Sequence, residues 1–147
     1  MNAPRTTAPP RGDFPVFRSI ATRWLDNDHY GHVNNVVYYS YFDTAVNGYL
    51  IDTAGTDIRT LPAIGLVVET GCQYFAPISF PDQLEVGLAL ERLGHSSVTY
   101  RLAVFVAGHA QAAAAGRFVH VYVDSDTRKP VAVPEVIRRA IESLKKL

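Results

Sequence analysis

The chain has a single cysteine, Cys72, among its 147 residues. An intrachain disulfide is therefore impossible, which suits a protein that folds in the reducing cytoplasm. No stretch approaches the roughly 20 consecutive apolar residues that a membrane-spanning helix needs. The N-terminus also lacks the apolar segment of a secretory signal. We therefore expect a cytoplasmic protein that makes no use of a membrane.

An excess of charge of either sign is missing too. The 14 Lys and Arg residues balance the 14 Asp and Glu residues, whereas a nucleic-acid binder usually carries a basic excess or stripe. Hydrophobic residues make up 48% of the chain and charged residues 19%, as in ordinary globular proteins. The length fits one domain. We expect residues 1–13, rich in Pro, Thr and Ala, to be a disordered tail and residues 14–147 to form the domain.

One long helix is predicted over residues 33–55. Its apolar residues recur at steps of three or four, the helical period. Asn34 or Asn35 can cap the start, and Gly55 fits the left-handed position just past the end. The repeating residues are Val36, Tyr39, Phe42, Val46, Tyr49 and Leu50.

The rest of the chain alternates with the period of strands. An extended segment covers residues 14–24, and strands are predicted near 66–74, 84–91, 98–106 and 110–123. Gly116 is expected to mark a bulge or a close approach within the last strand. A short final helix begins near Pro134. A helix on one face of an antiparallel sheet is an α+β architecture.

The densest polar cluster is the run D-N-D-H-Y-G-H-V-N-N from Asp26 to Asn35, just before the long helix. A helix N-terminus presents unpaired N–H groups and a partial positive charge, which can hold the oxyanion formed on a carbonyl. A carboxylate a few residues upstream can act on the same carbonyl as nucleophile or general base. Gly31 can supply the tight loop. These are the requirements of acyl transfer without a serine nucleophile.

The run from Arg23 to Asp43 resembles the signature of the 4-hydroxybenzoyl-CoA thioesterase family, D-x-D-x-x-G-H-V-N-N followed by an aromatic-rich helix. Weaker likenesses follow at residues 77–86 and 94–98, so the resemblance spans roughly residues 16–142. It implies the hotdog fold, an antiparallel sheet wrapped around a long central helix. It also implies a homodimer as the minimal unit, with a homotetramer as the larger option, and active sites at the subunit interface.

The resemblance also implies roles for single residues. Asp28 matches the catalytic carboxylate, Asn35 the position whose backbone N–H binds the thioester carbonyl, and Gly31 and His32 the loop between them. The implied activity is hydrolysis of an acyl-CoA to a carboxylic acid and CoA, with no cofactor or metal. Benzoyl-specific members depart from the G-H-V-N-N form, which favours a fatty or general acyl group here. The main alternative is a non-catalytic hotdog protein that senses acyl thioesters.

Other interpretations of the same residues stay open. Asp28 can merely cap a turn, and Asp26 is the rival carboxylate. His29 and His32 lack the spacing of a zinc site. The turn at residues 94–98 contains Ser96 and Ser97 beside a histidine, but it lacks the second glycine of the G-x-S-x-G elbow.

Several further side chains have weaker expectations. Cys72 and most of the helix aromatics are expected in the core, with one or two aromatics lining an acyl tunnel. Glu69 faces solvent or reaches a partner's site, and Asp43 has an uncertain role. Candidates for the CoA phosphates are Arg92, Arg128, Lys129, Arg138 and Arg139.

Overall fold

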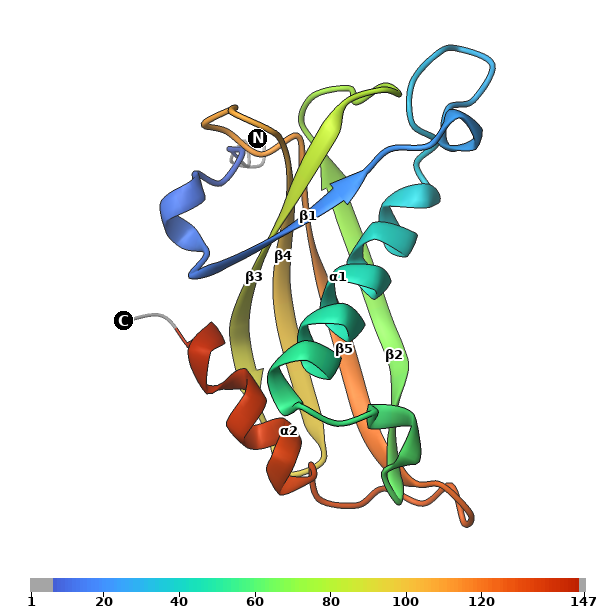
Figure 1. The fold of residues 1–147 in the computed structure, drawn as a ribbon, viewed down its shortest axis with the longest axis vertical. Helices are drawn as coiled ribbons and strands as arrows, with labels where there is room; N and C mark the ends of the chain where they lie inside the picture. The colour runs from blue at the N-terminus through green and yellow to red at the C-terminus, as the bar shows by residue number, and fades with distance from the viewer. Residues whose placement is uncertain (1–6, 146–147) are drawn as a thin grey trace, which may run out of the picture.

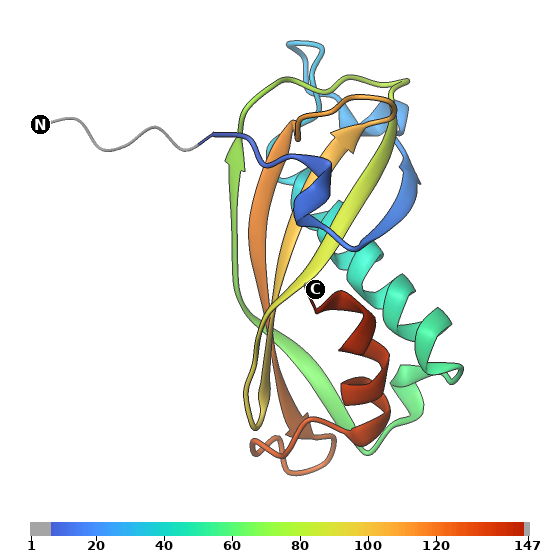
Figure 2. The ribbon, with the colours of Figure 1, turned by 90° about the vertical axis from the view of Figure 1, so that its left-hand side faces the viewer.

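A computed structural model describes residues 7–145 of the chain and contains one antiparallel sheet with a helix across one face (Figure 1). The order across the sheet is β1-β3-β4-β5-β2, so β1 and β2 form the edges. Figure 2 shows the sheet curving around that helix. The strands are β1 (Val16–Ala21), β2 (Ala63–Tyr74), β3 (Gln83–Leu93), β4 (Ser97–Val106) and β5 (Ala114–Asp124).

The predicted central helix is α1 (Val37–Ala54), 18 residues long. It ends as expected at Gly55, which has φ of 68°. Its start lies later than predicted, because the residues after Asn34 form a turn in which the Asn34 side chain accepts from the Val36 amide at 3.3 Å. Val36 is consequently 62% exposed and does not belong to the core. The helix residues buried against the sheet are Tyr38, Tyr41, Phe42, Ala45, Val46, Tyr49 and Leu50.

The alternation predicted for β2 does not produce a buried face along its whole length. Leu66, Val67 and Val68 are exposed, with Val68 at 59%. β2 is an edge strand, and its register with β5 shifts between Val67 and Glu69. The centre of this strand therefore presents apolar side chains and unpaired backbone groups to the outside.

Gly116 is a point of close approach, as the sequence indicated, but its pairing with Cys72 and Leu102 is regular and contains no bulge there. β5 also begins at Ala114 rather than Ala110. A side chain at Gly116 would collide with the Gly71 carbonyl and the Phe42 ring. The absence of a side chain at this position lets the sheet and α1 pack closely together.

Gly116→Ala is expected to destabilise the protein by about 1 to 3 kcal/mol, the usual range for overpacking a core. Urea unfolding followed by circular dichroism measures this. Gly71→Ala is the matched control on the neighbouring strand, because a Cβ there meets no atom within 4 Å. Equal stability of the two variants would contradict the close packing at Gly116.

The C-terminal elements close the other end of the core. α2 (Glu135–Ala140) continues into a 3-10 turn (Ile141–Leu144), and its apolar stripe is buried as predicted except for the partly exposed Val136. The Tyr49 hydroxyl of α1 donates to the Ala140 carbonyl at 2.6 Å. This bond ties α2 to α1.

Residues 7–13 of the expected tail are among the described residues. Arg11–Asp13 form a 3-10 turn, and Arg11 donates to Glu85 at 2.8 Å on β3. Phe14, only 4% exposed, then packs with Phe105 on the face of the sheet away from α1. Residues 1–6 lie outside the described residues. These charged and aromatic contacts join residues 11–14 to the sheet.

The arrangement of a five-stranded antiparallel sheet and a central helix fits the hotdog fold. Among residues 7–145, no helix has the length and apolar character needed to cross a membrane.

Candidate functional site

The loop between β1 and α1 is anchored by Asp26. This side chain is 1% exposed and accepts hydrogen bonds from the Arg23 amide and the Tyr41 hydroxyl, each at 2.8 Å. The Arg23 guanidinium also pairs with it at 3.0 Å. Burial alone raises the pKa of the Asp26 carboxyl, but these bonds and the positive charge outweigh burial and hold that pKa below its ordinary value. Asp26 is thus occupied by structural bonds, which weakens it as the rival catalytic carboxylate.

Asp28 lies in a tight loop that Gly31 makes possible. The Asp28 amide donates to the His32 carbonyl at 2.9 Å, and the Gly31 amide donates to the Asp28 carbonyl at 3.0 Å. Gly31 has φ of 89°, a conformation that residues with a side chain rarely adopt. The loop therefore turns the chain back toward the start of α1.

The Asp28 carboxylate is half engaged. Its Oδ1 accepts from the Tyr30 amide at 2.9 Å, so the turn-capping interpretation describes one oxygen. Within residues 7–145, Oδ2 has no hydrogen-bond donor. One carboxylate oxygen is held in place while the other is available for chemistry.

Residues that the sequence did not single out hold this loop from outside. Ser79 Oγ donates to the Gly31 carbonyl at 2.7 Å, and Asn27 Oδ1 accepts from the Phe80 amide at 3.0 Å. The Val33 amide donates to the Ile78 carbonyl at 2.7 Å. These partners are some 45 to 53 residues away in the chain, so no local pattern could have indicated them. The segment before β3 therefore supports the loop that contains Asp28.

Asn35 lies in the turn that leads into α1. Its carbonyl accepts from the Tyr74 hydroxyl at 3.0 Å, which ties it to the end of β2. Its own amide has no acceptor within the part of the chain that the structure describes. Such an amide, just before a helix, can donate to a bound carbonyl oxygen.

A surface hollow opens beside Asp28. Two apolar side chains of its wall are strongly exposed, Trp24 at 74% and Leu25 at 82%. His32 and Asn35 are not among the residues of its wall, so a single subunit does not gather all four expected site residues around one cavity. The hollow is lined by Trp24, Leu25, Asn27, Asp28, His29 and Gly31.

The other candidate residues lie elsewhere. The turn at residues 94–98 lies at the far end of β3 from Asp82, whose carbonyl accepts from the Thr22 hydroxyl near the Asp28 loop. Ser96 and Ser97 are therefore remote from Asp28 of the same chain. Arg138 is held there by the Gly94 carbonyl at 3.0 Å. No group of three or more His, Cys, Asp or Glu side chains in residues 7–145 is placed to hold a metal ion.

The remaining acidic and thiol candidates have ordinary structural surroundings. Glu69 pairs with Arg117 at 2.9 Å on the exposed sheet face. Asp43 is exposed and accepts from Asn47 of its own helix at 3.0 Å. Cys72 packs against the main core, and burial raises the pKa of its thiol to about 11, as suits a core residue.

The family to which the sequence belongs agrees with the fold described above. Residues 22–141 match the thioesterase-like superfamily, and the chain belongs to it. This is a broader group than the 4-hydroxybenzoyl-CoA thioesterase family that the first motif resembles. Among curated proteins, none matches the sequence.

Solved structures of other proteins share this fold. The PA5185 protein from Pseudomonas aeruginosa strain PAO1 is 53% identical over 95% of this chain and 97% of its own, with a TM-score of 0.91. The PA2801 protein from Pseudomonas aeruginosa is 29% identical over 87% of this chain and 98% of its own, with a TM-score of 0.79. Slr0204, a 1,4-dihydroxy-2-naphthoyl-CoA thioesterase from Synechocystis, is 19% identical to this chain. At that identity the likeness shows a shared fold and nothing more. That match covers 85% of this chain and 93% of Slr0204, with a TM-score of 0.78.

Proposed function

We propose that the protein is an acyl-CoA thioesterase that releases a carboxylic acid and CoA, with Asp28 as the reacting carboxylate. The observation that carries the proposal is the half-engaged Asp28, one oxygen held by the Tyr30 amide and the other free, beside a surface hollow. Superfamily membership supports the reaction class.

In the proposed reaction, the Asn35 amide donates to the thioester carbonyl and stabilises the oxyanion. Asp28 then either attacks the carbonyl carbon or removes a proton from an attacking water. Attack expels the CoA thiolate and leaves an anhydride that water hydrolyses. General-base action forms the acid and CoA in one addition and elimination. Gly31 and His32 maintain the loop geometry in both routes, through the bond of the His32 carbonyl to Asp28.

We also propose that two subunits pair through their β2 edges. A long exposed edge with apolar side chains favours pairing with another strand. Pairing of this kind buries Leu66, Val67 and Val68. It also brings partner residues toward the catalytic loop, because Tyr74 at the end of β2 is bonded to Asn35.

Val68→Lys is expected to convert the dimer into monomers and to lower kcat/KM at least about tenfold, because a lysine on an edge strand opposes pairing. Sedimentation velocity measures the mass, and a thiol-trapping assay measures the rate. Ile51→Lys is the control, since Ile51 is a partly exposed apolar residue on α1 rather than on the edge strand. A Val68→Lys variant that stays dimeric would contradict the β2 interface.

The activity itself is tested with a panel of acyl-CoAs and a reagent that traps the released CoA thiol. We expect turnover on at least one acyl length and none when the CoA part of that substrate is replaced by an unrelated small thiol. Measurable binding without turnover on every member of the panel would instead identify a sensor of acyl thioesters.

A further inference from the structure

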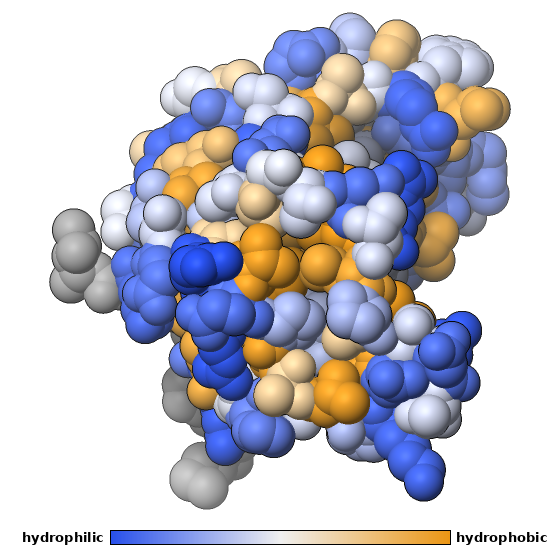
Figure 3. All heavy atoms as spheres, turned by 60° about the horizontal axis from the view of Figure 1, so that its bottom comes forward, coloured by the Kyte–Doolittle hydropathy of each residue, from blue (hydrophilic) through white to orange (hydrophobic). Residues whose placement is uncertain are grey.

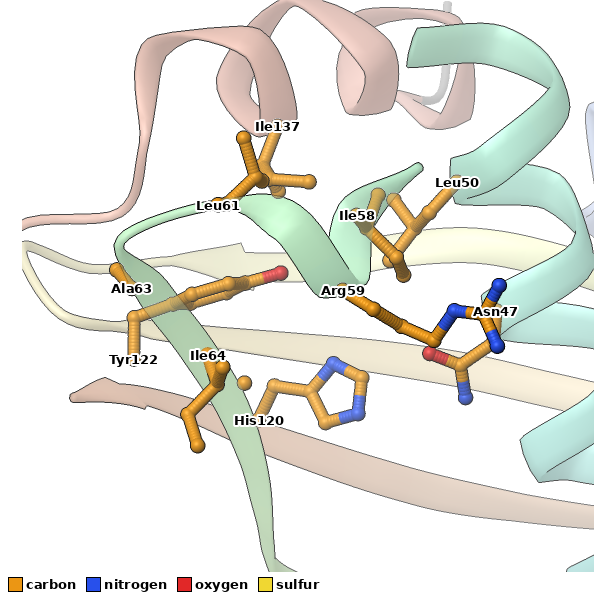
Figure 4. A pocket seen from close by; sticks show the side chains of 11 residues that line it. Asn47, Leu50, Ile58, Arg59, Leu61, Ala63, Ile64, His120, Tyr122 and Ile137 are labelled. Carbon is orange, nitrogen blue, oxygen red and sulfur yellow. The ribbon is translucent and has the colours of Figure 1, made fainter. Parts of the chain in front are cut away.

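A second cavity lies at the other end of the molecule from Asp28, between the C-terminal half of α1, the start of β2 and α2. Its volume is about 150 Å³. Leu50, Leu61 and Ile137 contribute to its apolar wall, and Asn47 and Arg59 contribute polar groups (Figure 4). Figure 3 views the surface from this end of the molecule and shows apolar residues exposed in a hollow between polar ones.

His120, on β5, is a buried polar side chain in the wall of this cavity. The residue is 3% exposed, and its Nδ1 has no hydrogen-bond partner among residues 7–145. The neighbouring Tyr100, with its ring centroid 5.8 Å from that of His120, has an equally unpartnered buried hydroxyl. Figure 4 shows the His120 ring directed into the space between Ile64, Arg59 and Asn47. Unpaired buried polar groups are rare because each typically costs about 1 to 3 kcal/mol.

The backbone over His120 is shaped to leave this ring room. A Cβ at Gly65 would lie 3.1 Å from the Tyr122 ring and 3.3 Å from the His120 ring. Burial lowers the pKa of His120 to about 4, so the imidazole is neutral at physiological pH. A neutral imidazole offers one donor and one acceptor. The cavity therefore combines an apolar body with a neutral group able to bind a hydroxyl or carbonyl.

In the proposed dimer, this cavity adjoins a catalytic loop. It is lined by Ala63, Ile64 and Gly65 at the start of β2, whereas Tyr74 at the end of β2 holds Asn35. When two copies of β2 pair antiparallel, the start of one lies beside the end of the other. The cavity of one subunit then opens near the catalytic loop of its partner. Within one chain, the cavity residues Asn47 and Leu50 lie roughly 15 to 20 Å along the helix from its start at Val37, at 1.5 Å per residue.

We propose that this cavity receives the far end of the acyl group, and that preferred substrates carry a neutral hydrogen-bonding group there, such as a hydroxyl, which His120 binds. The inference rests on the proposed thioesterase function and on the β2 dimer. A cavity of about 150 Å³ accepts a group the size of benzene, or about six non-hydrogen atoms. A plain alkyl end leaves His120 unpaired, and sites built to bind a hydroxyl discriminate strongly against analogues that lack it.

The test compares hexanoyl-CoA with 6-hydroxyhexanoyl-CoA as substrates. For the wild-type protein, we expect kcat/KM to favour the hydroxylated acyl group by about tenfold or more. His120→Phe should abolish that preference, because phenylalanine offers the hydroxyl no hydrogen-bond partner. His109→Phe is the matched control on the exposed turn between β4 and β5. It should keep the wild-type preference.

The outcomes separate the two proposals. Absence of turnover on every acyl-CoA would overturn the thioesterase function itself. Turnover of both six-carbon substrates at equal kcat/KM, or a preference that persists in His120→Phe, would overturn recognition by His120 and leave the thioesterase standing. The wild-type comparison decides the question even where His120→Phe does not fold.

Discussion

Asp28→Asn should lower kcat by about two to four orders of magnitude, the usual contribution of a positioned acid or base. An amide can neither attack a thioester effectively nor accept the proton of a water. Asparagine keeps the side-chain oxygen that accepts from the Tyr30 amide, so the loop should hold its shape. Steady-state rates on the best acyl-CoA of the panel measure the effect, and isothermal titration with CoA measures binding, which should stay nearly unchanged.

The matched control for this variant is Asp43→Asn. Asp43 is also an exposed carboxylate in the signature region, but it accepts from Asn47 within its own helix. We expect wild-type rates from it. If Asp28→Asn also turned over substrate at the wild-type rate, Asp28 would have no place in the reaction.

Asp26→Ala should have the largest effect on stability, about 2 to 4 kcal/mol less free energy of unfolding, because it leaves buried donors without an acceptor. The Tyr41 hydroxyl and the Arg23 amide both lose their partner. Urea unfolding measures the loss. Tyr41→Phe is the comparison, since it removes one donor and leaves the carboxylate bonded to Arg23; a loss of about 1 kcal/mol is expected. Equal losses would show that the charge of Asp26 adds nothing.

The same carboxylate predicts a dependence of stability on pH. The pKa of Asp26 is lowered in the folded state, so the unfolded chain takes up the proton first as pH falls. The stabilisation is fully present above about pH 4, the ordinary pKa of an aspartate, and is lost as pH falls through the lower folded value. The free-energy difference between wild type and Asp26→Asn should therefore stay level near neutral pH and shrink as pH falls below about 4. A constant difference would contradict the lowered pKa.

The sequence alone does not distinguish the surroundings of the two carboxylates in the D-N-D run. Both Asp26 and Asp28 are polar residues in one loop, and their spacing does not say which is buried. The fold decides it, because Tyr41 of α1 faces Asp26 across 15 residues while Asp28 faces the hollow. The motif pointed to this loop, and the packing gave its two acids different surroundings.

Local pattern determined much of this protein. The helical period of α1, its end at Gly55, the extended runs of β3 and β4, and the glycine in the Asp28 loop all follow from neighbours a few residues apart. Such features depend on backbone geometry and on the spacing of apolar residues, which the sequence displays directly.

Tertiary structure alone decided the features that join distant segments. It placed β2 at an exposed edge, it brought Ser79 against the Asp28 loop, and it buried His120 Nδ1 beside a cavity with no partner among residues 7–145. Each depends on which strands become neighbours and on what the packing around a side chain leaves unpaired. Those quantities arise from contacts between residues far apart in the chain, and no local period records them.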